Sequence, residues 1–272
     1  MKISVDCGDA ELRGEIVGQG TPLLLIHGWP LDRRIFAPQI ATLRRYFSVI
    51  SYDRRGFGES SGEPDLRREL DDINRLLNSC TDQTVHLLGM SQGARIALRY
   101  AVTHPDRLRS LILQGVVIDG VSIAEPVNER IPTTDYAELI QQGRMEKFQN
   151  LWQQHPMMRV DKENKVAINL LNKILGDYRG ADLLNYSEDK YSFSVDIMTA
   201  LKQFKLPALL LTGARETMAR KEYASRLLEV LPDVREVILA NSGHLSNLTE
   251  TEKYNQTIID FCNEIESKIN IT

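Results

Sequence analysis

Short, almost wholly apolar runs alternate along this chain with segments whose apolar residues recur every three or four positions. A strand that is apolar at every position must be covered on both faces, and segments of helical period can supply that cover. The pattern therefore predicts an α/β fold with a mostly parallel sheet between helices. The expected strands are Leu12–Val17, Leu23–His27, Val49–Asp53, Val85–Met90, Leu111–Val117, Ala208–Thr212 and Val237–Ala240, and the expected helices are Ala37–Tyr46, Leu66–Ser79, Gln92–His104, Glu222–Leu231 and Thr251–Lys268.

The stretch from Ile118 to Phe204 interrupts this alternation. It has helical-period segments around Tyr136–Trp152 and Val166–Leu175 but no convincing strand. We therefore expect a helical insertion of residues 118–204 within an α/β core made of residues 1–117 and 205–272. Its apolar residues are candidates for lining a substrate-binding pocket, and packing within the insertion is the alternative role: Phe148, Trp152, Met157 and Met158.

Charge and cysteine content limit the partners that we expect. The 272 residues include 33 basic and 37 acidic side chains, which gives a formal net charge of −4 and no general attraction to phosphate backbones or anionic lipid. The three cysteines lie far apart without zinc-site spacing, so we expect no disulfide and no metal. No apolar stretch is long enough for a signal region or membrane span. We expect a cytoplasmic monomer or small homo-oligomer that binds a small molecule, and neither nucleic acid nor membrane.

The most specific local motif is Gly89–Met90–Ser91–Gln92–Gly93. It fits Gly-x-Ser-x-Gly, directly after an expected strand and directly before an expected helix. A sharp strand-to-helix turn forces the nucleophile into a strained backbone conformation and requires small flanking residues. We expect Ser91 to be a nucleophile with a sparsely allowed backbone conformation, near the positive end of the helix dipole.

A serine hydroxyl needs a base, and the base needs a group that orients it. Of the five histidines, His244 follows the last expected strand in a polar loop, where its side chain can reach the edge of the sheet. Glu216 follows the preceding expected strand and is the first candidate for the acid. Asp119, just past the strand before that, is the alternative, and pairing with Arg215 or Arg220 is the structural role that Glu216 would otherwise have.

An oxyanion produced by serine attack needs two N–H donors. Gln92, the residue after the proposed nucleophile, supplies one candidate amide. Trp29 supplies the other, because it follows Gly28 in a loop at a strand end and Pro30 has no N–H. The Trp29–Pro30 peptide is a candidate for the cis form, which X-Pro bonds adopt at low cost.

Three sequence features together resemble the α/β-hydrolase superfamily, and the resemblance covers nearly the whole chain. They are the order of nucleophile, acid and base, the loop after the second expected strand and the turn after the third: Ser91–Glu216–His244, His27–Gly28–Trp29–Pro30 and Tyr52–Asp53–Arg54–Arg55–Gly56–Phe57–Gly58–Glu59–Ser60. The chain is most similar to esterase, enol-lactonase and cofactor-free perhydrolase branches. The resemblance implies an eight-stranded sheet, a helical cap after strand six and catalysis without a cofactor.

The chain also departs from the family pattern. The acid position usually holds Asp with Pro four residues later, whereas this chain has Glu216 and Arg220. The serine nucleophile argues against haloalkane dehalogenases and epoxide hydrolases, which use aspartate. The sequence therefore predicts a serine hydrolase that cleaves a small carboxylic ester or lactone through an acyl-enzyme.

Two other functions are retained as alternatives. A proline-type aminopeptidase would use acidic residues to hold the amino group of its substrate, and the candidates are Glu138, Glu146, Asp182 and Glu188. A non-enzymatic protein that binds a small ligand on the same scaffold is the third possibility, although such a protein has no need of Ser, His and acid together.

Overall fold

The computed structural model describes residues 1–269, so residues 270–272 of the expected core segment lie outside the described part. Eight strands form one sheet in the order β1-β2-β4-β3-β5-β6-β7-β8. β2 pairs antiparallel with β1 and β4, and the other pairs are parallel. The strands are β1 Lys2–Asp6, β2 Glu11–Val17, β3 Pro22–Ile26, β4 Ser48–Tyr52, β5 Val85–Met90, β6 Leu108–Gln114, β7 Ala208–Gly213 and β8 Val234–Leu239. The mostly parallel eight-stranded sheet predicted from the sequence is confirmed.

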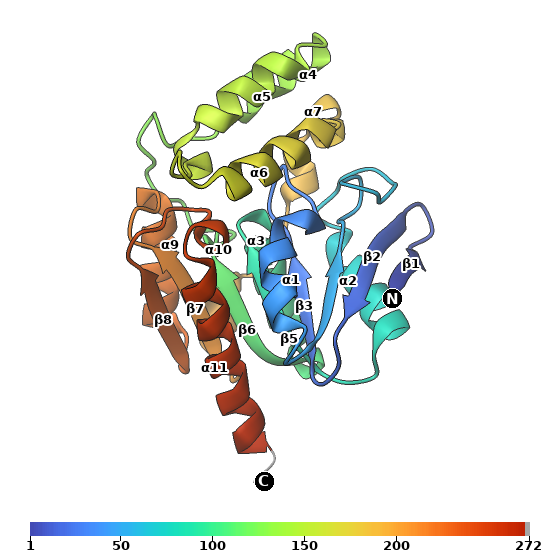
Figure 1. Cartoon of the computed structure of the whole chain (residues 1–272), viewed down its shortest axis with the longest axis vertical. Coiled ribbons are helices and arrows are strands. Elements are labelled where there is room, and N and C mark those ends of the chain that lie inside the picture. Colours follow the sequence, from blue (N-terminus) through green and yellow to red (C-terminus); the bar gives the residue numbers. More distant parts are fainter. Residues whose placement is uncertain (270–272) are drawn as a thin grey trace.

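Alternate residues of the central strands feed two separate cores. Leu23 and Leu25 of β3 face one core, whereas Leu24 and Ile26 face the other, and all four are fully buried. On the first face lie α1 (Ala37–Leu43) and α11 (Thr251–Ile269), and on the second lie α2 (Glu69–Cys80), α3 (Gln92–Thr103) and α9 (Met218–Val230) (Figure 1). Cover on both faces explains why these strands are apolar at every position.

β1 is the strand that the apolar runs did not reveal. It is an antiparallel edge strand in which only Val5 is buried. Its sequence therefore lacks the continuous apolar run of the inner strands, and only the resemblance implied an eighth strand.

The segment between β6 and β7 contains helices and no strand. They are α4 Thr133–Gln141, α5 Met145–Gln154, α6 Lys165–Asp177, α7 Ala181–Leu184 and α8 Ile197–Leu201. Helices α4 to α7 gather beyond the carboxyl ends of the parallel strands (Figure 1), whereas α8 packs against α3. The remaining short helices are η1 Arg33–Phe36, η2 Pro105–Arg107, η3 Pro156–Met158, η4 Glu188–Tyr191 and α10 Ser246–Thr249.

Aromatic packing joins these helices to the sheet through Trp29, in the loop after β3. The Trp29 ring lies 4.8 Å from that of Trp152 and 6.0 Å from that of Phe148, measured between centroids. Its indole N–H also donates to Asp182 Oδ2 at 2.5 Å. A residue of the core loop is therefore part of the apolar core of the insertion.

Candidate active site

Ser91 joins β5 to α3 with φ 55° and ψ −119°, and it is the one non-glycine with positive φ among residues 1–269. The sparsely allowed backbone expected at this position is confirmed. Such a conformation costs about 1 to 3 kcal/mol and persists only where its surroundings enforce it. The backbone N–H of Ser91 donates to Gln114 O on β6 at 2.7 Å, which fixes the turn against the neighbouring strand.

The two glycines of the motif permit a close approach between α3 and the sheet. A Cβ added to Gly93 would lie 2.2 Å from Ile26 O, and one added to Gly89 would lie 2.4 Å from Gly93 O. Both contacts are with backbone atoms, which have no means of rotating away. Larger residues would therefore push α3 off β3 and β5 and displace Ser91.

His244, in the loop after β8, and Glu216, in the loop after β7, form a buried pair. His244 Nδ1 lies 2.7 Å from Glu216 Oε2, and the side chains are 5% and 2% exposed. The predicted contact between this carboxylate and Nδ1 is therefore present. An acceptor at Nδ1 places the ring proton there and leaves Nε2 free to accept a proton.

The environment of Glu216 keeps it ionised. Burial by itself raises the pKa of this carboxyl, but His244, the Thr217 N–H and Arg220 oppose it and the net direction is down. Thr217 N donates to Glu216 Oε1 at 2.7 Å, so each carboxylate oxygen has a partner.

Ser91 and His244 lie on either side of the end of β6. Among the described residues no hydrogen bond joins the Ser91 hydroxyl to the imidazole. Hydrogen bonds between a nucleophile and its base are often long in proteins without substrate and shorten in the complex.

Two residues at the end of β6 connect these groups, and the sequence analysis missed both. Gln114 accepts from Ser91 N through its backbone and donates from Nε2 to His244 O at 2.7 Å. A Cβ on Gly115, which has φ 60°, would lie 2.5 Å from His244 Cε1. A polar residue followed by glycine at the end of an apolar strand was the signal that could have identified them.

Asp119, the alternative acid, lies elsewhere. It accepts from Arg99 Nε at 2.7 Å and from Arg95 Nε at 2.7 Å, and among the described residues no hydrogen bond or ion pair joins it to His244. Burial raises the pKa of Asp119, but hydrogen bonds from the two arginines and their charges outweigh this effect. The net direction of the pKa is therefore down. Both of its carboxylate oxygens accept hydrogen bonds from arginines, which remain charged.

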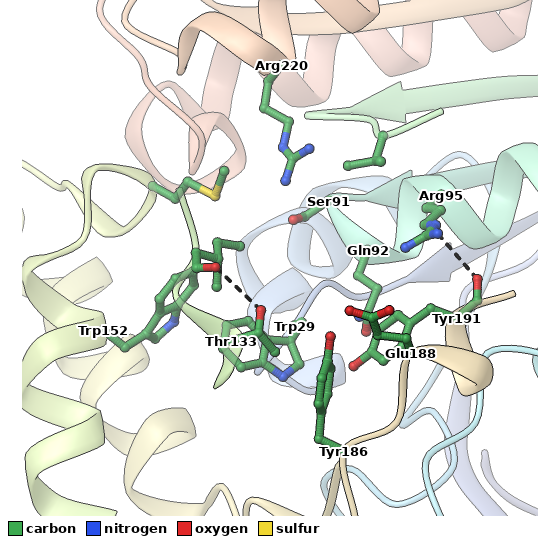
Figure 2. Close-up of a pocket in the computed structure, with 13 residues that line it drawn as sticks. Trp29, Ser91, Gln92, Arg95, Thr133, Trp152, Tyr186, Glu188, Tyr191 and Arg220 are labelled. Carbon is green, nitrogen blue, oxygen red and sulfur yellow. Dashed lines mark hydrogen bonds between the residues drawn. The ribbon is translucent and has the colours of Figure 1, made fainter. Parts of the chain in front are cut away.

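A cavity of about 380 Å³ opens at Ser91, a size typical of small-molecule sites. Figure 2 shows Ser91 Oγ at its wall, with Trp29, Trp152 and Gln92 around it. Phe148 lies behind Trp29, fully buried among aromatic rings, and does not line the cavity. The lining residues are Trp29, Ser91, Gln92, Arg95, Val117, Ile131, Thr133, Trp152, Met157, Tyr186, Glu188, Tyr191 and Arg220.

The backbone amides of Trp29 and Gln92 belong to residues of this wall. Within residues 1–269 neither N–H has a hydrogen-bond acceptor. The Trp29–Pro30 peptide bond is cis, as the sequence had suggested.

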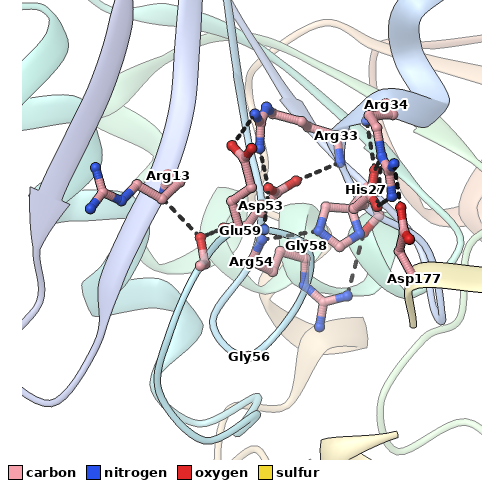
Figure 3. A network of polar contacts seen from close by, with 12 residues as sticks. Arg13, His27, Arg33, Arg34, Asp53, Arg54, Gly56, Gly58, Glu59 and Asp177 are labelled. Atoms are coloured by element: carbon pink, nitrogen blue, oxygen red, sulfur yellow. Dashed lines mark hydrogen bonds and ion pairs between the residues drawn. The ribbon is translucent and has the colours of Figure 1, made fainter. Parts of the chain in front are cut away.

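The loop that carries Trp29 is held by the turn after β4 (Figure 3). Asp53 Oδ1 accepts from Arg33 N and Asp53 Oδ2 from Glu59 N, both at 2.8 Å. Arg54 N donates to His27 Nε2 at 3.0 Å. Burial, followed by the charge of Arg54, lowers the pKa of His27 well below its ordinary value, so this histidine is a neutral structural acceptor.

Acidic residues are sparse in the cavity. Glu188 is exposed and lines it, whereas Asp182 is buried and bonded to Trp29 and Tyr178. Glu138 and Glu146 are exposed and do not line it.

Among the described residues no cluster of three or more His, Cys, Asp or Glu has the arrangement of a metal site. Within the same part of the chain, no helix is both long and apolar enough to span a membrane.

The family model for the alpha/beta hydrolase fold matches residues 21–251. The chain therefore belongs to the α/β-hydrolase family and is a hydrolase of that family. The AB hydrolase superfamily protein YisY of Bacillus subtilis is 27% identical over 270 residues, 92% of this chain and 94% of that protein. The (E)-2-((N-methylformamido)methylene)succinate hydrolase of Acinetobacter baylyi is 25% identical over 248 residues, 89% and 90% of the two chains.

A solved esterase from Exiguobacterium antarcticum superposes with a TM-score of 0.80. The superposition covers 96% of this chain and 99% of the esterase at 23% identity. At 23% identity, this structural similarity shows a shared fold.

Proposed function

We propose that this protein is a serine hydrolase that cleaves a small carboxylic ester or lactone through an acyl-enzyme. The observation that carries the proposal is the strained Ser91 at the start of α3, in the wall of a cavity and joined through Gln114 to the loop of the buried His244–Glu216 pair. A strained residue persists where function requires it, and these three residue types are the ones that nucleophilic acyl transfer uses.

Ser91 Oγ attacks the carbonyl carbon, and its proton passes to His244 Nε2. Collapse of the tetrahedral intermediate breaks the bond to the leaving oxygen, which receives that proton from His244. A water then loses a proton to the same nitrogen, attacks the acyl-enzyme and releases the carboxylic acid while Ser91 regains its proton. Glu216 holds the ring orientation and stabilises the imidazolium in both halves.

The Trp29 and Gln92 amides are the proposed donors to the oxyanion. Their lack of an acceptor within residues 1–269 supports this role, because an N–H without a partner beside a nucleophile is available to a developing negative charge. Gln92 is also at the positive end of the α3 dipole.

We further propose that the insertion acts as a cap that selects substrates, with Trp152 in the wall. Within the expected range of residues 118–204, α4 to α7 would form that cap, whereas α8 packs on α3 and would belong to the core. The aminopeptidase alternative has less support, since an amine-binding pocket needs a buried anion and Asp182 is already bonded to Trp29 and Tyr178.

The test is turnover of para-nitrophenyl esters, lactones and amino-acid amides by wild type and Ser91→Ala. Esters or lactones should be hydrolysed, and Ser91→Ala should lower kcat about 10⁶-fold. Ser246→Ala is the matched control, because this buried hydroxyl lies two residues from His244 and has no hydrogen-bond partner within residues 1–269. Hydrolysis that survives in Ser91→Ala, or a strict requirement for a free amine, would contradict the proposal.

A further inference from the structure

The cavity wall beside Ser91 carries a buried cation that has no anionic partner among the described residues. Arg220, in the first turn of α9, is 8% exposed and lines the cavity, and Figure 2 shows its guanidinium pointing toward Ser91. Its Nε is buried without a hydrogen-bond partner. Within residues 1–269, Arg220 makes no hydrogen bond and no ion pair, and its guanidinium carbon lies 5.9 Å from the centre of the Tyr223 ring.

Two carboxylates lie near Arg220, but neither forms an ion pair with it among the described residues. Glu216 and Glu125 both act on it electrostatically, but Glu216 uses both of its oxygens for His244 and Thr217. Glu125 is partly exposed and makes no ion pair with Arg220 within the described residues. Arg95, the other cation of the cavity wall, is held by Asp119.

The three other buried arginines among the described residues each form an ion pair. Arg54 binds Glu69, Arg55 binds Asp72 and Arg99 binds Asp119. A buried guanidinium without an anion is costly, because the charge has lost water and gained no partner. An arginine kept for stability alone would be expected to have a carboxylate like the other three.

We propose that Arg220 binds a carboxylate of the substrate, so that the enzyme prefers anionic esters or lactones to neutral ones. This inference rests on the proposed function, because it places the substrate in the cavity at Ser91. The planar guanidinium offers two parallel N–H donors, which match the two oxygens of a carboxylate. The same cation disfavours the free amine that an aminopeptidase substrate would bring.

The experiment compares two matched pairs of esters that differ only in one negative charge. The acyl-side pair is para-nitrophenyl hemiglutarate and its methyl-capped form. The alcohol-side pair is meta-carboxyphenyl acetate and its methyl ester. Wild type should show a kcat/KM at least about 10-fold higher for the anionic member of one pair, since a hydrogen-bonded charge contributes that much discrimination. No preference in either pair overturns the proposal.

The variants assign the preference to one residue. Arg220→Gln should bring the ratio of anionic to neutral kcat/KM close to one, whereas Arg215→Gln should keep it. Arg215 lies in the loop just before α9, is exposed and does not line the cavity, so it controls for the loss of one positive charge. A preference that survives in Arg220→Gln, or that Arg215→Gln also abolishes, would overturn the proposal.

Two further measurements keep the inference testable if a variant misfolds or turnover is absent. Arg220→Lys keeps the charge but not the two parallel donors, so the preference should fall several-fold, and an undiminished preference would count against the proposal. Calorimetric titration of Ser91→Ala should detect binding of glutarate but not of dimethyl glutarate. Failure of glutarate to bind would refute the carboxylate site, whereas failure of ester turnover with glutarate still bound would refute only the proposed function.

Discussion

Two carboxylates, Glu216, which is buried, and Asp119, whose side chain is 10% exposed, follow neighbouring strands of the sheet, and their partners differ. Glu216, after β7, faces His244, which can gain and lose a proton, and a backbone amide. Asp119, beyond β6, faces Arg95 and Arg99, which stay charged. From the sequence both were candidates for the same role. The comparison teaches that the partner, rather than the carboxylate, decides whether such a site can take part in proton transfer.

The difference extends to how each site is built. Asp119 pairs with two arginines on the same face of α3, four residues apart, so it ties the segment after β6 to that helix. Glu216 instead orients a single ring beside the cavity. We therefore expect Asp119 to contribute mainly to stability and Glu216 mainly to turnover.

The largest expected effect is on catalysis by Glu216→Gln. The amide no longer enforces the Nδ1–H tautomer or stabilises the imidazolium, so kcat should fall about 10⁴-fold. Asp119→Asn is the matched change and should leave kcat within a few-fold of wild type. Steady-state kinetics on the best ester of the panel measures both, and the reverse pattern would assign the acid to Asp119.

The next effect is on the free energy of unfolding of Asp119→Asn. Removing this charge leaves the buried Arg99 without its anion, which should cost about 3 to 5 kcal/mol. Glu216→Gln should cost less, because its histidine partner can become neutral. Urea denaturation at neutral pH compares the two variants. Equal losses would remove the distinction between a structural and a catalytic carboxylate.

Gly115→Ala should reduce turnover through the imidazole. The new methyl would meet His244 Cε1 at 2.5 Å and Nδ1 at 2.7 Å, and a displacement of about 1 Å costs about 10²-fold in rate. Gly120→Ala is the control, since Gly120 also has positive φ, 77°, but has open space around its Cα. Similar kinetics for the two variants would mean that backbone strain, and not contact with the ring, explains any loss.

The smallest effect is a pH dependence of stability. The folded-state pKa of Asp119 lies below its ordinary value of 3.8, so the stability it contributes is present above that pH and is lost as the pH falls through the folded pKa. The difference in urea midpoint between wild type and Asp119→Asn should therefore shrink below about pH 3.8. A difference that stays constant in acid would show that charge on Asp119 is not its source.

Local sequence patterns predicted the fold and most of the candidate site, because the structural features concerned depend on residues that are close together in the sequence. Fully apolar strands, the glycines around Ser91 and the loop before Pro30 are of this kind. The choice between Glu216 and Asp119 depended on Arg95 and Arg99, which lie on a helix more than 15 residues before Asp119 in the sequence. No local spacing encodes that contact.

The same limit applies to residues whose role arises from tertiary contact. Gln114 and Gly115 look like the end of a strand until β8 and its following loop bring His244 against them. Phe148 and Trp152 have the same helical spacing, yet only Trp152 reaches the cavity, because Trp29 covers Phe148. The sequence presented Arg220 as a departure from the family pattern and as a possible partner of Glu216, and gave no sign that it lines the cavity.

The most direct test of the central claim does not require the substrate to be known. The rate at which a fluorophosphonate labels the protein, followed by intact mass and mapped by peptide digestion, reports on nucleophile and base together. We predict one adduct on Ser91, formed at least about 100-fold more slowly in Glu216→Gln and within a few-fold of the wild-type rate in Asp119→Asn. An adduct elsewhere, or slow labelling in Asp119→Asn with normal labelling in Glu216→Gln, would contradict the account.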